Sequence, residues 1–420
     1  MKVLEVAVAA WFVAAPGTAR AEGPLTLDRA IELAMSRNER ASIADLDVSI
    51  AEANLALART RFLPLVDSQG TVAFRPRNDP GTVAEASIAL SQPIFDPSAF
   101  PLHSQAKHEL AAGKAQRIDD RRRLAFDAAS AFFTVLLADQ VAQAAQRKLD
   151  TAKTNLDTTD AQFKAQLVSS NDVTRAQINL STAARELAAS QGNLQAAYID
   201  LELLLNTRID AGLAPPAGLL AAGRAPFVVT DDVIANGTSQ RLDLVADKEL
   251  ARAAHESARE PKMRYLPSVQ LGAEVAATTN APLSGNTLDA LVAISARWTL
   301  FDSGARSADA KARDARARIL DLEASQLQRS IEAEIRAAAL LLASRQQALT
   351  AAGTARDAAR KGADEALILY RQGLAKAIEL VDANDQRFNA EVNYASSEFD
   401  VARAYLSLRL AMGLDPLEGK

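Results

Sequence analysis

The sequence predicts a mainly α-helical protein with a smaller β part, built from two copies of one structural unit. Three observations predict this fold class: a repeat with a nearly constant offset, long stretches without proline, and two short stretches of alternating hydrophobicity. The repeated landmarks are residues 61–66 with 264–269, residues 94–96 with 300–302, and Phe163 with Tyr370. Because the offset stays between 203 and 207 residues, we interpret the chain as a tandem duplication.

Composition excludes several classes of function. The chain has 420 residues, is 49% hydrophobic and carries a net charge of −5, with no basic patch for nucleic acid. Cysteine is absent, which excludes disulfides and thiolate chemistry. Of three histidines, His103 and His108 lie five residues apart, off the spacing that places two ligands on one helix face. We therefore expect no metal site, no cofactor and no enzymatic activity.

Residues 1–21 have the layout of a secretory signal peptide. Lys2 precedes an apolar run that Glu5 interrupts once, and Ala19-Arg20-Ala21 forms a cleavage site of the A-x-A type. An ordinary N-terminal helix is the alternative. Elsewhere we expect no transmembrane helix, so a membrane-spanning part would have to be a β-barrel.

The first repeat is expected to cover residues 22–209. It begins with a helix over 27–61, followed by a β-hairpin over 66–92 in which apolar or small residues alternate with polar ones. Long helices are expected over 98–209, because no proline and only three glycines lie between Pro101 and Pro215. From Leu124 to Leu156, alanine and leucine recur at spacings of four and three, which is typical of a coiled-coil seam. A helix over 98–160 would be about 90 Å long.

A linker rich in glycine, alanine and proline follows over 210–229, and the second repeat is expected over 230–420. Its helix is predicted over 238–264, its β-hairpin over 269–299 and its long helices over 304–414. Four strands cannot close a barrel, so several chains would each have to contribute four. With the signal peptide, this points to a bacterial outer membrane. A half-buried hairpin packed on a helix, in a soluble protein, is the alternative.

The ordered elements of both halves resemble the TolC-like outer-membrane efflux protein family. The resemblance rests on residues 61–64 at the end of a helix, on Gln92-Pro-Ile-Phe-Asp96 and on Trp298-Thr-Leu-Phe-Asp-Ser-Gly304. It continues to Leu205-Asn206 in the first half and to Met412-Gly-Leu414 in the second. It implies a homotrimer whose twelve strands form one outer-membrane barrel in contact with lipid, continued by a long α-helical barrel in the periplasm.

The resemblance also implies where the functional residues lie, at the turns between the long helices. There the chain would contact a periplasmic adaptor (membrane fusion) protein through Gln166, Leu167, Val168, Gly373 and Leu374. Gln166 stands where the family usually has glycine, which weakens this assignment for the first turn. Asp172 and Tyr370 match positions that bridge neighbouring helices in the closed state; a helix-end aromatic packed on Leu374 is the alternative for Tyr370.

Glu379 and Asp382 are three residues apart and therefore share a helix face. In a trimer they would form stacked rings of negative charge, a pore constriction that selects by charge; two solvated surface acids are the alternative. The function implied is a passive, gated exit duct of a tripartite efflux pump or type I secretion system, working with an inner-membrane pump. A soluble periplasmic coiled-coil scaffold or adaptor is the alternative function, and a heavy-metal efflux duct is a variant of the first.

Overall fold

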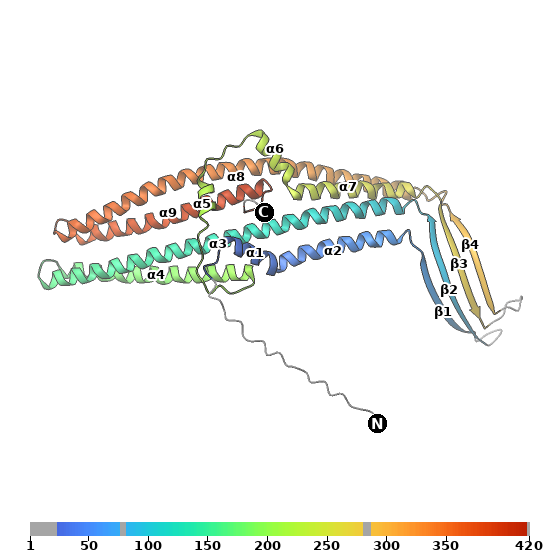
Figure 1. Cartoon of the computed structure of the whole chain (residues 1–420), viewed down its shortest axis with the longest axis horizontal. Helices are drawn as coiled ribbons and strands as arrows, with labels where there is room; N and C mark the ends of the chain where they lie inside the picture. The colour runs from blue at the N-terminus through green and yellow to red at the C-terminus, as the bar shows by residue number, and fades with distance from the viewer. Residues whose placement is uncertain (1–22, 76–80, 280–286, 418–420) are drawn as a thin grey trace, which may run out of the picture.

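The computed structural model describes residues 23–75, 81–279 and 287–417. The predicted signal peptide lies outside these residues. The chain forms a long helical body with a small sheet at one end (Figure 1). This confirms the predicted mainly α-helical fold with four strands and an internal duplication.

Each half contributes two short helices, two strands and two long helices. The first half comprises α1 (Leu27–Arg37), α2 (Glu39–Thr60), β1 (Leu65–Arg75), β2 (Gly81–Phe95), α3 (Ala99–Lys164) and α4 (Ser170–Leu205). A helix in the connecting segment, α5 (Ala217–Arg224), lies where the sequence predicts only a linker. The second half comprises α6 (Asp231–Gln240), α7 (Leu242–Met263), β3 (Ser268–Thr278), β4 (Leu288–Arg297), α8 (Ala305–Arg371) and α9 (Ala377–Ala411).

The single helix predicted over 27–61 is in fact two helices, and the break falls at Asn38. Its side-chain oxygen accepts a hydrogen bond from the backbone of Arg40 at 2.9 Å and caps α2. Its amide nitrogen donates to the carbonyl oxygen of Leu204 at 2.8 Å, near the end of α4. A short polar side chain that bonds the backbone in this way favours a helix start over a helix interior.

The second half has the same break at Arg241, between α6 and α7. Arg241 Nη1 donates to the carbonyl oxygen of Ala411 at 3.1 Å, and Ala411 lies 207 residues after Leu204. The guanidinium also binds Asp243 through two nitrogens, at 3.0 and 2.6 Å, and Glu334 at 2.9 Å. The helix predicted over 238–264 therefore begins after Arg241 instead, and the arginine anchors the end of α9 as Asn38 anchors the end of α4.

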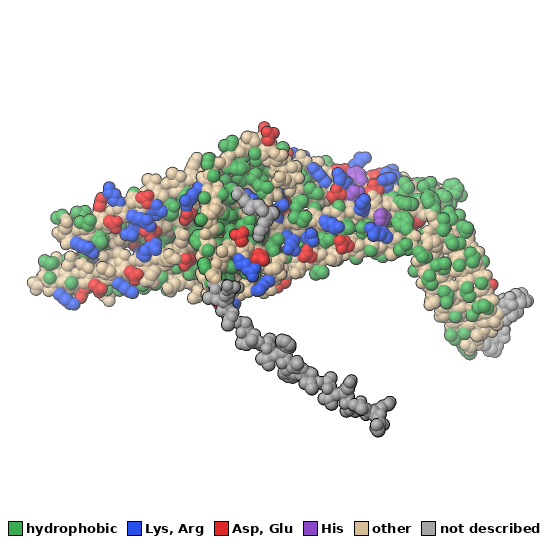
Figure 2. Space-filling view, in the orientation of Figure 1, with side chains coloured by type: hydrophobic (Ala, Val, Ile, Leu, Met, Phe, Trp, Pro, Cys, Tyr) green, Lys and Arg blue, Asp and Glu red, His purple; other side chains and the backbone are tan. Residues whose placement is uncertain are grey.

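The four strands form one antiparallel sheet in the order β1-β2-β3-β4. The central pair joins the two repeats, with Ile88 opposite Val275 and Leu90 opposite Ala273. Many apolar side chains of the sheet are strongly exposed; Val72 and Ile294, for example, are 73% and 74% exposed. Figure 2 shows hydrophobic side chains over the visible face of the sheet and mixed charges along the helical body. Within the described chain, β1 and β4 each pair on one side only.

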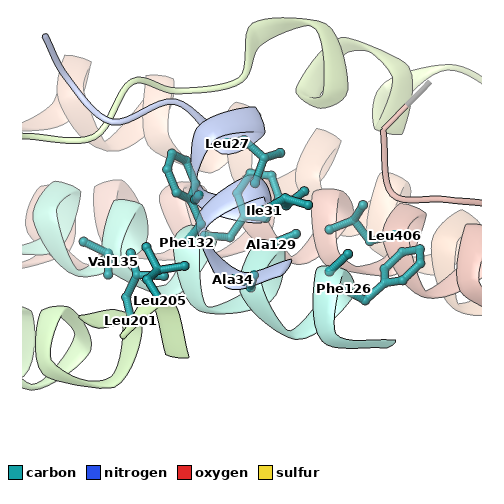
Figure 3. Close-up of a cluster of buried hydrophobic side chains, with 14 of the residues drawn as sticks. Leu27, Ile31, Ala34, Phe126, Ala129, Phe132, Val135, Leu201, Leu205 and Leu406 are labelled. Carbon is teal, nitrogen blue, oxygen red and sulfur yellow. The ribbon is translucent and has the colours of Figure 1, made fainter. Parts of the chain in front are cut away.

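The main core lies where α1 crosses α3, α4 and α9. Leu27 and Ile31 of α1 pack there with Phe132 of α3, beside Leu201 and Leu205 of α4 (Figure 3). A second, smaller core gathers around α6, α8 and α9, where Ile234, Ile331 and Leu408 are buried. The two cores occupy corresponding places in the duplication, so the middle of the molecule holds the two helical hairpins together.

Helix α3 contains a stretch that is long and apolar enough to cross a membrane by length and composition, which the sequence analysis did not expect. Half of that stretch is buried inside the protomer. The 66 residues of α3 give a length of about 99 Å. Helix α3 therefore packs as the central helix of the helical body.

Beside the sheet, the helices pack side by side in the order α2, α3, α7, α8. The helices at the two ends of this layer carry exposed apolar side chains. On α2, Ile43, Leu46, Ile50 and Leu57 are 55–67% exposed. On α8, Ile319 and Leu322 are 50% and 70% exposed. The helical layer and the sheet are thus open at the same two ends, and each open helical end carries an apolar stripe.

Candidate functional site

The tip of the molecule, opposite the sheet, consists of two turns with the same backbone hydrogen bonds. In the first turn, Gln166 donates to the carbonyl of Phe163 at 2.8 Å and Leu167 donates to that of Gln162 at 2.9 Å. In the second turn, the backbone amides of Gly373 and Leu374 make the same two bonds to residues 370 and 369, at 3.0 and 2.9 Å. This pair of bonds defines a Schellman motif, which ends a helix with one residue in the left-handed conformation.

Gln166 is that left-handed residue in the first turn, with φ of 62°, and Gly373 is its counterpart, with φ of 73°. The glutamine therefore does not change the backbone shape of the turn, although it stands where the family resemblance leads us to expect glycine. It does carry a cost, because a side chain with a β-carbon is disfavoured in this conformation by about 1 kcal/mol. The leucines that follow, Leu167 and Leu374, are 74% and 73% exposed.

We expect Gln166→Gly to stabilise the tip by about 0.5–1 kcal/mol, because it removes this conformational cost. Hydrogen exchange of the backbone amides in the α3–α4 turn should slow accordingly. Gly373→Ala is the matched control: no atom lies within 4 Å of the added β-carbon, so the left-handed conformation alone should destabilise the second turn. Faster exchange in Gln166→Gly would contradict the assignment of strain to this residue.

Asp172 and Tyr370 line the same cleft at the tip, of about 930 Å³, but do not bond to each other within the protomer. The Asp172 carboxylate accepts hydrogen bonds from the backbone nitrogen and hydroxyl of Ser169, at 3.1 and 2.8 Å. The buried Tyr370 hydroxyl is 2.8 Å from the hydroxyl of Thr159 on α3. The residues of both turns, Gln166, Leu167, Val168 and Gly373, border this cleft, and Leu374 lies next to it along the chain.

Glu379 and Asp382 lie in the first two turns of α9, and both are exposed. Asp382 accepts a hydrogen bond from Gln386 one turn later, at 2.8 Å. Leu380, between the two acids, is buried at 2% exposure, so α9 presents the acids away from its packed side. Two carboxylates on one exposed helix face give this end of the protomer a local negative charge.

Farther from the tip along the long helices, a cluster of charged side chains connects the two helical hairpins. Arg147 of α3, Arg360 of α8 and Arg387 of α9 converge on the buried Glu391, at 2.9, 3.1 and 3.3 Å. Burial raises the pKa of Glu391, but hydrogen bonds from Arg147 and Arg360 outweigh it and hold the pKa below its usual range. Glu391 therefore stays ionised and keeps the three helices connected.

Lys148 makes a second connection, to Glu186 of α4 at 2.7 Å and to Asp385 of α9 at 2.8 Å. Burial lowers the pKa of Lys148, but the hydrogen bonds that it donates to the two carboxylates outweigh this effect, so the pKa is raised. Neither charge cluster was predicted from the sequence, nor was the role of Thr159. Heptad spacing marks the buried side of each helix, but it does not show which charged residues of distant helices meet. Among the described residues, no group of three or more histidine and acidic side chains could hold a metal ion.

A model of the outer membrane efflux protein family matches residues 30–207 and again 234–414, one match per half. No curated protein matches the chain. Among solved structures, the channel CusC aligns with a TM-score of 0.80 at 17% identity, covering 92% of each chain. The MtrE outer membrane channel of Neisseria gonorrhoeae aligns with a TM-score of 0.77 at 20% identity, covering 94% of this chain and 91% of its own. The CmeC outer membrane channel of Campylobacter jejuni aligns with a TM-score of 0.76 at 16% identity, covering 94% and 87%. At these identities the structural likeness shows the fold.

Proposed function

Because the chain belongs to the outer membrane efflux protein family, and is thus an outer-membrane efflux channel and not an enzyme, we propose that three copies form one continuous tunnel. The four strands of each copy would build a twelve-stranded barrel in the outer membrane. The long helices would continue the tunnel into the periplasm. Family membership favours this function over the alternative of a soluble periplasmic scaffold.

One observation carries the trimer proposal: the sheet and the helical layer are open at the same two ends. Strand β4 of one copy can pair with β1 of the next, because both have an unpaired edge and the pairing continues the antiparallel order. The rotation that pairs β4 of one copy with β1 of the next also brings the apolar stripe of α8 against the apolar stripe of α2. Closing the ring gives hydrogen-bond partners to the backbone groups at the two strand edges and buries both apolar stripes. A single copy can do neither.

The trimer is tested by crosslinking between copies, in a chain that has no cysteine of its own. We expect the variant with Leu46→Cys on α2 and Leu322→Cys on α8 to give crosslinked dimers and trimers with a flexible bismaleimide. Each single variant should remain monomeric on denaturing gels. So should the double variant Leu46→Cys, Leu374→Cys, whose second cysteine lies at the tip. A double variant that gives no more crosslinking than these controls, or a monomer in native mass spectrometry, would contradict the trimer.

We further propose that the tip binds a periplasmic adaptor protein, through which an inner-membrane pump supplies the energy for export. The exposed Leu167 and Leu374 at equivalent places in the two turns support this, together with Gln166, Val168 and Gly373 beside them. Photo-crosslinkable residues at positions 167 and 374 should capture the adaptor in cells, whereas the same residue at position 46 should not. In the trimer, Asp172 and Tyr370 are proposed to bridge neighbouring helices in the closed state, and Glu379 and Asp382 to form the pore constriction.

A further inference from the structure

Just above the tip, four long helices of one protomer line a partly open cavity of about 320 Å³. Its walls come from α3 and α4 on one side and from α8 and α9 on the other. This volume lies at the lower end of the range for small-molecule sites, roughly 300–1,000 Å³. The cavity adjoins the cleft at the tip, because Arg175, Tyr370 and Ile378 line both. A ligand inside it is an addition to the function proposed above.

Asn155 of α3 brings an unused hydrogen-bond donor to the cavity wall. Its side chain is 7% exposed, and its amide nitrogen has no hydrogen-bond partner among the described residues. The neighbouring hydroxyls of Thr159 and Tyr370 are 2.8 Å apart and bond each other. A buried donor without an acceptor costs free energy, so a ligand that offers an acceptor oxygen would gain from meeting it.

The free charge at the cavity wall is positive. Arg175 of α4 is an exposed residue at the mouth of the cavity, where the cavity meets the tip cleft, and it forms no ion pair with another described residue. The one carboxylate in the wall, Asp385, is already bound by Lys148 at 2.8 Å. A guanidinium and an amide N–H in the wall of one cavity suit a carboxylate, because both groups donate hydrogen bonds and a carboxylate accepts them.

Apart from Asn179 and Thr182 of α4, the remaining wall is apolar. Ala176 of α4 faces it from the first hairpin, and Ile378, Leu380 and Val381 of α9 face it from the second. We propose that this cavity is a binding site for a small monocarboxylate with an apolar body, aromatic or branched aliphatic. The carboxylate would accept hydrogen bonds from Asn155 Nδ2 and from Arg175, and the body would lie on Ile378 and Leu380.

A ligand in this position contacts both helical hairpins at once. It would therefore stabilise the arrangement of helices in which the cavity exists, by an amount set by its concentration relative to its dissociation constant. A cation, or a neutral molecule of the same shape, would lack the interaction with Arg175 and bind less tightly.

The test uses benzoate as the probe and the full-length protein in detergent micelles. Saturation-transfer NMR should show saturable binding of benzoate, and cyclohexanecarboxylate should compete with it. Benzamide, which has the same shape without the charge, should bind at least about tenfold more weakly, since a hydrogen bond to a charged group is worth more than one between neutral groups. This comparison needs no mutation and so does not depend on the folding of a variant.

Arg175→Gln and Asn155→Asp should each weaken benzoate binding by about tenfold or more. The second change replaces the amide donor with a carboxylate. Arg185→Gln is the matched control, because this exposed arginine lies on the same helix outside the cavity. The proposal is overturned if benzoate and benzamide bind equally, if empty micelles give the same signal, or if Arg185→Gln weakens binding as much as Arg175→Gln.

Discussion

Arg241→Ala is expected to lower the free energy of unfolding by about 3–5 kcal/mol, the usual cost of removing one member of a buried ion pair. The Arg241 side chain is 7% exposed and connects three helices. It holds Asp243 on α7, Glu334 on α8 and the Ala411 carbonyl at the end of α9. Alanine leaves the half-buried charge of Asp243 and the Ala411 carbonyl without this partner, and the ion pair that Asp243 keeps is the longer contact to Arg123, at 3.4 Å.

The pH dependence of stability gives a second readout of the same contact. Burial raises the pKa of Asp243, but the hydrogen bonds and charge of Arg241 outweigh it and hold the pKa below its ordinary value of 3.8. A carboxyl with a lowered folded-state pKa contributes stability above its unfolded pKa, and this contribution is lost as the pH falls through the folded value. The stability difference between wild type and Arg241→Ala should therefore be largest near neutral pH and narrow below about pH 3.8.

Thermal unfolding in detergent, followed by circular dichroism at several pH values, measures both effects. Hydrogen exchange should also speed up at the start of α7 and the end of α9. Asn38→Ala is the matched control in the first repeat, where one amide makes the equivalent contact to Leu204; it should cost only about 0.5–2 kcal/mol. Equal losses in the two variants, or a difference independent of pH, would contradict the role given to the arginine.

Removing Glu379 and Asp382 together should raise the single-channel conductance and nearly abolish the selectivity for cations over anions. In the proposed trimer these acids form two rings of three carboxylates at the narrow end of the tunnel, where a ring of one charge attracts cations and repels anions. The double variant Glu379→Ala, Asp382→Ala removes both rings. Planar-bilayer recordings in a salt gradient measure the conductance and, from the reversal potential, the ion preference.

The control must remove the same charge elsewhere. Asp231→Ala with Asp232→Ala does so in the first turn of α6, on the outside of the helical body and far from the tip (Figure 1). These recordings should match wild type. If the tip variant also keeps wild-type conductance and selectivity, the acids are surface residues and the constriction lies elsewhere.

The elements whose periodicity or composition is continuous could be predicted from the sequence. The alternation of apolar and polar residues identified the two hairpins, and the long stretches without proline identified α3 and α8. The breaks at Asn38 and Arg241 were missed. Each depends on a hydrogen bond to the end of a helix more than 160 residues away along the chain, and neither residue interrupts the local helical pattern as proline would.

In the candidate site, too, some features could be predicted from the sequence and others could not. The places of the two turns followed from the family resemblance, and the repeat of Phe163 as Tyr370 placed them at equivalent points of the two halves. The left-handed conformation of Gln166 could not be predicted, because it is imposed by the Schellman hydrogen bonds and not favoured by glutamine. Nor could the partners of Glu391, since the three arginines come from three helices and lie up to 244 residues away in the chain.

The open ends of the sheet also have a consequence for the time before assembly. A newly made copy exposes two strand edges that can pair with any other extended chain, which is a recognised route to aggregation. The helical hairpins join neighbouring segments and can fold early, whereas closure of the barrel has to wait for two further copies. The lifetime of the lone protomer, and any chaperone that shields β1 and β4 during it, would then decide how much of the protein reaches its membrane.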